Sequence, residues 1–215
     1  MFPAKIYNLR LDTSIKTFLK DLEALHKTYK WKWTEPTKVG DYHWRTTDVE
    51  IEPAGRHSDD AISQFLYNLT IPGVRAVRGT SEISFSYNHR FRIELPREYP
   101  ARVDSIKVFS ETPIYHPRFR SGGMSKGCVT INGEIDRILM DLIFQVLLDP
   151  ARVQPPNMYR TDHGTNSGAM SWYMEAGPDK VFKRLFLEWE QHGKKTETKE
   201  QRTTAKKGTT PLIRE

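Results

Sequence analysis

Residues 135–147, IDRILMDLIFQVL, hold the strongest periodic pattern in the chain and decide how its second half folds. Their apolar residues recur at the i, i+3, i+4, i+7 spacing of one helix face. These residues are Ile135, Ile138, Leu139, Leu142, Ile143, Val146 and Leu147. We predict an amphipathic helix here, with its apolar side laid on a sheet.

The segments before this helix change to a period of two. Short alternating runs at 74–77, 83–87, 91–95 and 106–109 are separated by turn residues, which predicts four antiparallel strands in a meander. Helical spacing also occurs at 12–29, 58–69, 169–176 and 181–189, and a short strand is expected at 46–51. The expected class is α+β, a four-stranded antiparallel meander flanked by helices.

Composition and length indicate a soluble globular protein. The chain has 215 residues, of which 37% are hydrophobic and 11% aromatic. No run approaches the roughly 18 apolar residues of a membrane span, and the first residues lack the apolar run of a secretory signal. With a single cysteine as well, we expect a cytoplasmic protein that does not bind membranes.

The positive charge is concentrated at the C-terminal end. The formal net charge is +6, and residues 193–215 contribute +4 of it through seven Lys/Arg and three Asp/Glu. A nucleic-acid domain usually has its basic residues on the folded face, so nucleic acid is not the expected partner. We expect 192–215 to be a basic disordered tail. Residues 29–44 mix tryptophans with lysines, which leaves RNA binding as an alternative to packing of the rings.

Cys128 is the only cysteine in the chain. A lone thiol forms no intramolecular disulfide, so a special role for it is chemical. The thiolate is the nucleophilic form, and an ordinary thiol with a pKa near about 8.5 is partly ionised at neutral pH. The alternative is a small buried core residue without a chemical role.

This cysteine belongs to one of four motifs that follow one another in the chain. They are Glu98-Tyr99-Pro100, Ile114-Tyr115-His116-Pro117, Gly127-Cys128-Val129-Thr130-Ile131 and Leu147-Leu148-Asp149-Pro150. In this order, and with the 135–147 helix, the chain resembles the ubiquitin-conjugating enzyme family. The resemblance covers 58–191, so 1–57 is expected to be an N-terminal extension with an amphipathic helix.

The resemblance implies a mechanism centred on Cys128. The cysteine accepts the C-terminal glycine of a ubiquitin-like modifier from an activating enzyme as a thioester, and an amine of a protein substrate then takes it. A ligase as a further partner is left open. No cofactor is expected, and one cysteine with seven dispersed histidines gives no zinc-ligand spacing.

Two other residues are carried over from the resemblance. His116 is expected to support the loop by hydrogen bonds to backbone, although a Cys–His catalytic pair stays open. Asp162 is the candidate that positions the incoming lysine. Its alternative is an ordinary turn residue, and His163, Asn157 and Asn166 are weaker options for the same position.

One departure from the family pattern follows His116-Pro117. The family has an asparagine at the next position, linked to stabilising the oxyanion, where this chain has Arg118. The loss of such a donor costs about 3 kcal/mol in a preorganised site. Arg118 itself, or backbone N–H groups around Gly122-Gly123, are the alternative donors.

The predicted function is therefore a divergent conjugating enzyme. Its departure at Arg118 and its N-terminal segment suggest the bacterial ubiquitin-like conjugation systems, several of which belong to antiviral operons. The alternative is a non-catalytic adaptor of the same fold that binds a modifier or another protein.

Overall fold

The computed structural model describes residues 3–78, 82–99, 106–119, 125–126, 134–153 and 166–207, with backbone alone at 125–126 and 193–207. The helices in this part of the chain are α1 (Ala4–Thr28), α2 (Ile135–Val146), α3 (Pro150–Val153), α4 (Ser167–Ala176) and α5 (Pro178–Lys207). The strands are β1 (Thr37–Gly40), β2 (His43–Arg45), β3 (Val49–Arg56), β4 (Ile62–Leu69), β5 (Gly73–Arg78), β6 (Glu82–Ser86), β7 (His89–Glu94), β8 (Lys107–Ser110) and β9 (Ser125–Lys126).

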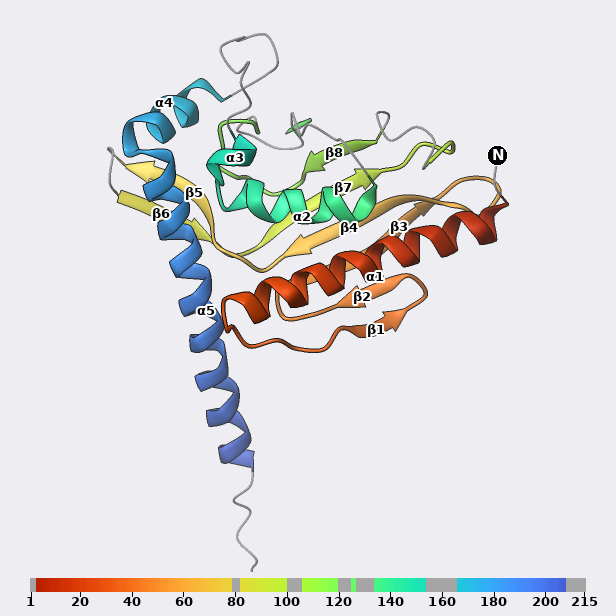
Figure 1. Ribbon diagram of the computed structural model, residues 1–215, viewed down its shortest axis with the longest axis horizontal. Helices are drawn as coiled ribbons and strands as arrows, with labels where there is room; N and C mark the ends of the chain where they lie inside the picture. The colour runs from red at the N-terminus through yellow and green to blue at the C-terminus, as the bar shows by residue number, and fades with distance from the viewer. Residues whose placement is uncertain are drawn as a thin grey trace, which may run out of the picture.

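The described strands form one antiparallel sheet and a separate hairpin. The sheet has seven strands in the order β1-β2-β3-β4-β7-β8-β9, and β5 pairs only with β6. The α+β class and the antiparallel sheet are confirmed (Figure 1). The four-stranded meander is wrong, because two of its four runs are β5 and β6. That hairpin is inserted between two neighbouring strands of the large sheet, β4 and β7.

Residues 58–69, for which the spacing predicts a helix, turn after β3 and form β4. Phe65, Tyr67 and Leu69 alternate along this strand and are all buried. A register irregularity between β3 and β4 then leaves Ile62 buried as well, three residues before Phe65. This irregularity gave a strand the i, i+3 spacing of a helix, which is why the prediction was wrong.

The first helix begins eight residues before its predicted start, at Ala4. Tyr7 and Leu11 extend the buried stripe toward the N-terminus, so the packing face continues past Asp12. Asp12 does not cap the helix. Its Oδ1 accepts a hydrogen bond from Trp44 Nε1 on β2 at 2.9 Å, and its Oδ2 is 2.7 Å from Lys16 Nζ.

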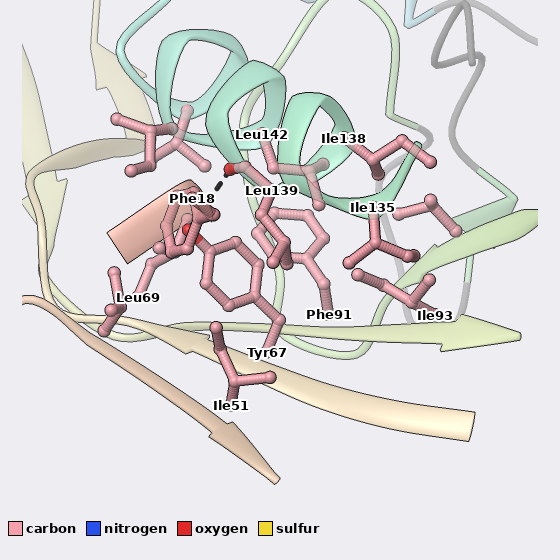
Figure 2. Close-up of a cluster of buried hydrophobic side chains, with 14 of the residues drawn as sticks. Phe18, Ile51, Tyr67, Leu69, Phe91, Ile93, Ile135, Ile138, Leu139 and Leu142 are labelled. Atoms are coloured by element: carbon pink, nitrogen blue, oxygen red, sulfur yellow. Dashed lines mark hydrogen bonds between the residues drawn. The ribbon is translucent and has the colours of Figure 1, made fainter. Parts of the chain in front are cut away.

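The core lies between the sheet and two helices. Helices α1 and α2 pack against each other on one side of the sheet (Figure 1). Figure 2 shows α2 residues Leu139 and Leu142 over Tyr67, with Phe18 of α1 alongside. Tyr67 donates its hydroxyl hydrogen bond to the Leu139 carbonyl at 3.2 Å. Residues 4–56 thus contribute α1 and three strands to the same core and sheet as the residues after 57.

Helix α5 packs against residues from the first quarter of the chain. Trp189 donates to Asp48 Oδ1 at 3.2 Å, and Asp48 Oδ2 lies 3.0 Å from Nε2 of the buried His26. The helix then continues past the sheet as far as Lys207 (Figure 1). Residues 193–207 are thus helical, where a disordered tail was expected, and residues 208–215 lie outside the described part.

Candidate functional site

The His116-Pro117 turn is the best-defined part of the candidate site. It follows β8, and an antiparallel bridge between His116 and Phe119 closes it. The ring of Phe119 packs 4.8 Å from the ring of His116, and the residue before the turn, Tyr115, donates its backbone N–H to the Val74 carbonyl at 2.8 Å. The turn is therefore fixed to the β5–β6 hairpin before it and to its own aromatic neighbour after it.

Both ring nitrogens of His116 bind backbone. Nε2 donates to the carbonyl oxygen of Gln145 on α2 at 2.8 Å, and Nδ1 accepts from the N–H of Arg118 at 2.9 Å. These partners assign the proton to Nε2. Burial lowers the pKa of His116 to about 3, and the positive charge of Arg118 acts in the same direction. A fully buried, neutral imidazole with both nitrogens occupied organises the loop and is not placed to act as a general base.

Arg118 is also buried and hydrogen-bonded within the protein. Its side chain is buried, with the residue 4% exposed, and its Nε donates to the carbonyl oxygen of Val153 on α3 at 3.3 Å. The long side chain thus connects the turn to α3. Arg118 is one of the two alternative oxyanion donors expected from the sequence, and this geometry gives it a structural role.

Cys128 lies outside the described residues, but the strand that leads to it is described. Ser125 and Lys126 form β9 and pair with Ser110 and Phe109 of β8. Lys126 is two residues before Cys128 in the sequence. β9 is the edge strand of the sheet and runs antiparallel to β8, the strand that precedes the His116-Pro117 turn.

Asp162 also lies outside the described residues, as do His163 and Asn157. The structure resumes at Asn166, whose backbone N–H donates to the carbonyl oxygen of Pro117 at 3.0 Å. This bond brings the start of α4 to the His116-Pro117 turn. Of the polar residues proposed for this loop, Asn166 is the one that the structure places next to the turn.

Sequence reasoning missed the contribution of α2 to this site. Gln145 supplies a backbone carbonyl to His116, and its side-chain Nε2 donates to the carbonyl oxygen of Arg152 at 3.1 Å. One helical turn earlier, burial raises the pKa of Asp141, which lies 3.3 Å from Arg152 Nη1. A backbone acceptor leaves no signature in a sequence. The sequence therefore predicted the helix that contains Gln145 and gave no sign of its bond to His116.

The tryptophans at 29–44 are partly buried and pack against the core. The rings of Trp31 and Trp33 lie 5.6 and 5.2 Å from the ring of His26, and Trp31 is 4.7 Å from Trp189. Tyr29 stacks on Trp31 at 5.2 Å and is about half exposed. The packing interpretation of the tryptophans is confirmed, which removes the main reason to expect RNA binding there.

Groups of three or more His, Cys, Asp or Glu that could hold a metal ion were not found among the described residues. None of the described helices combines the length and the apolar character that a membrane crossing requires.

Comparison of the sequence with models of protein families and with curated proteins finds no match. The chemistry of the site is therefore argued from its own residues.

Proposed function

We propose that this protein is a conjugating enzyme for a ubiquitin-like modifier and that Cys128 carries the modifier as a thioester. The observation that supports this most is the fixed His116-Pro117 turn. His116 holds the turn on α2, and Pro117 holds the start of α4. The same β8 edge that leads into the turn pairs with β9, two residues before Cys128. His116 and Pro117 thus join α2 and the start of α4 to the turn, and β9, which pairs with the strand before the turn, precedes Cys128 in the sequence.

The order of elements supports a ubiquitin-conjugating-enzyme-like fold as part of the proposal. A long N-terminal helix precedes an antiparallel sheet, the His116-Pro117 turn follows β8, and α2 then lies over the sheet before α4 and α5. In this arrangement the N-terminal residues belong to the fold, because α1 packs on α2.

The proposed reaction has two acyl transfers. The Cys128 thiolate attacks the thioester carbonyl of the modifier on its activating enzyme, and the thiolate of that enzyme leaves. An amine of a protein substrate then attacks the new thioester, an amide forms, and the Cys128 thiolate leaves while the amine loses its proton to water. The step needs no cofactor. The setting proposed for it is the cytoplasm, in a bacterial conjugation system of the antiviral kind.

The test combines the purified chain with ATP, an activating enzyme and a glycine-terminated ubiquitin-like modifier. We expect an adduct that disappears on addition of a reductant. Cys128→Ala should form none, and Cys128→Ser should form an oxygen ester that survives the reductant and is cleaved by alkali. An adduct that persists in Cys128→Ala contradicts the proposal.

The adaptor alternative predicts a different result for the thiol. Because Cys128 is the only cysteine, alkylation of the whole chain by iodoacetamide reports on this residue alone. A conjugating enzyme should react in its folded state. Alkylation that requires urea, together with binding of the modifier and no adduct, would favour the adaptor.

A further inference from the structure

His26, in the last turn of α1, lies between two hydrogen-bond acceptors. The residue is 5% exposed, its Nδ1 lies 2.7 Å from the Lys32 carbonyl oxygen, and its Nε2 lies 3.0 Å from Oδ2 of Asp48. Neither oxygen can donate when Asp48 is ionised, so both contacts are favourable only while both ring nitrogens carry a proton. The geometry therefore fits a buried imidazolium ion.

Asp48 is the charged side chain that faces this ring. Its Oδ1 accepts from Trp189 of α5 at 3.2 Å, so each carboxylate oxygen has a donor, as an ionised carboxyl group requires. Tyr67 of β4 is neutral beside it, because burial and the charge of Asp48 raise the pKa of its hydroxyl. On α1 itself, the neighbouring Lys27 is exposed and pairs with Glu23. The charge state of the ring is thus decided by Asp48 and by burial.

Loss of one proton from the ring affects its two contacts differently. A hydrogen bond to a charged oxygen is roughly twice as strong as one to a neutral oxygen, so the proton that stays is the one on Nε2, which faces Asp48. The lone pair of Nδ1 then faces the Lys32 carbonyl oxygen at 2.7 Å, and an attractive contact becomes repulsive. Deprotonation therefore acts on the segment that contains Lys32.

Residues 29–34, which we call the strap, form this segment and contact α5. The strap leaves the C-terminal end of α1 beside α5 (Figure 1). The centroid of the Trp31 ring lies 4.8 Å from that of Phe186 and 4.7 Å from that of Trp189. The ring of Tyr29 lies 4.6 Å from the ring of Phe186. The strap thus covers aromatic side chains of α5.

The strap has two features that are unfavourable while it lies against α5. Lys30 has a φ of 57°, in the left-handed region that residues other than glycine rarely adopt. The Nε1 donor of Trp33 is buried and has no acceptor among the described residues, and water would supply one if the strap opened. The bond from the Trp31 N–H to the His26 carbonyl at 2.9 Å does not titrate, so the Lys32 contact is the one that pH controls.

We propose that the proton on His26 closes the strap over α5, and that loss of this proton opens the strap and exposes Phe186 and Trp189. Burial alone would lower the pKa of the ring, but Asp48 and the Lys32 carbonyl raise it above its ordinary value of about 6.5. The charged ring therefore stabilises the closed strap below about pH 6.5, and this stabilisation is lost as the pH rises through the folded pKa. The switch acts on α5 whether or not the protein is a conjugating enzyme.

Amide hydrogen exchange of the whole chain, read by mass spectrometry at pH 6 and pH 9, tests this switch. Labelling times are scaled for the pH dependence of the intrinsic exchange rate, and proton NMR gives the folded pKa of His26. In Asp48→Asn the new amide can donate to Nε2 and still accept from Trp189, so the neutral ring keeps its N–H for Lys32. His43→Gln removes another histidine that lies 2.9 Å from a carboxylate and is the matched control.

In wild type, exchange in the strap should be faster at pH 9 than at pH 6, by about tenfold for each unit by which the pKa of His26 exceeds about 6.5. It should remain faster than exchange in α2, whose buried face opens only with the core. His43→Gln should repeat this result, and in Asp48→Asn the strap should stay protected at both pH values. Equal corrected rates at the two pH values in wild type, strap exchange no faster than that of α2, or a wild-type response in Asp48→Asn would overturn the proposal.

Discussion

Nε2 of His116 donates to the carbonyl oxygen of Gln145 across 2.8 Å, deep in the protein and 29 residues along the chain. This bond ties the turn before the proposed catalytic segment to the helix that follows it. The turn and α2, which precede and follow Cys128 in the sequence, are therefore held together directly. A conjugating enzyme needs this constraint, because its thioester must meet both a large donor and a large acceptor in one geometry.

His116→Ala should destabilise the protein in a pH-dependent way. The change leaves the Gln145 carbonyl and the Arg118 N–H unpaired, at a cost of about 3 kcal/mol in the free energy of unfolding at pH 7. The folded pKa of His116 is about 3, whereas the ordinary value is about 6.5. Between these two pH values the imidazole is therefore protonated in the unfolded chain and neutral in the native protein. The stability that His116 contributes is therefore present above pH 6.5 and lost as the pH falls toward 3.

The measurement is urea unfolding of wild type and His116→Ala at pH 7 and pH 5, followed by tryptophan fluorescence. The deficit of the variant should shrink by up to about 2 kcal/mol at the lower pH, since only wild type loses the His116 contribution. A deficit that does not change with pH contradicts a neutral buried ring.

Arg118→Asn places at this position the residue that ubiquitin-conjugating enzymes have after His-Pro, and we expect it to impair the protein. The shorter side chain cannot reach Val153, so a buried carbonyl loses its donor and α3 loses its connection to the turn. The expected loss is about 2–3 kcal/mol in the free energy of unfolding. Arg137→Asn, at an exposed position on α2, should change it by less than about 0.5 kcal/mol. Faster aminolysis in Arg118→Asn would instead show that position 118 faces the reaction.

The helices of this fold and the antiparallel class of its sheet were largely predictable from spacing, and the pairing of the strands was not. Helix 135–147 is confirmed almost to the residue as α2, because its apolar positions sit on one long stripe that packs in one direction. Strand β4 was misread because the register irregularity with β3 displaced one of its buried residues. The separation of the β5–β6 hairpin from the sheet depends on long-range pairing of β4 with β7, which no local pattern encodes.

The candidate site was predictable in its residue types and only partly in their roles. The His116-Pro117 motif gave the turn, and the structure adds that its partners are backbone atoms of Gln145 and Arg118. Asn166 was one of several polar residues in a loop until its bond to Pro117 singled it out. Such a bond joins residues 49 positions apart, and a single sequence contains no signal for it.

Asp48→Asn should lower the pKa of His26 below that of wild type. Burial alone would lower this pKa, but the hydrogen bond and charge of Asp48, with the Lys32 carbonyl bound to Nδ1, raise it above its ordinary value. The stability gained from the charged ring is thus present below about pH 6.5 and lost as the pH rises through the folded pKa. Asparagine at position 48 removes the charge and leaves an oxygen for Trp189.

Proton NMR of the His26 ring checks this prediction directly. The wild-type midpoint should lie above about 6.5, and the Asp48→Asn midpoint should fall below it, where burial dominates. Equal midpoints in the two proteins would mean that Asp48 does not hold the His26 proton.

Gly73→Ala should be strongly destabilising, although the change adds only a methyl group. A Cβ atom at this position would lie 2.6 Å from both Cε1 and Nε2 of the His89 ring and 3.0 Å from Val146 Cγ1. His89 is 1% exposed and its Nε2 lies 3.0 Å from the Ser86 carbonyl, so the ring has no free space and cannot move without losing this contact. We expect a loss of about 2–3 kcal/mol in the free energy of unfolding.

Chemical denaturation of Gly73→Ala, His89→Ala, the double variant and a control isolates this contact. Gly40→Ala, where the nearest atom is His43 Cβ at 3.7 Å, should cost little and serves as the control for the glycine substitution itself. In the double variant Gly73→Ala/His89→Ala the ring that clashes is gone, so the two losses should sum to more than the measured total by about 1 kcal/mol or more. Strict additivity of the two changes would show that the His89 ring is not what excludes a side chain at position 73, and that the β5–β6 hairpin accepts the methyl group by moving away from β7.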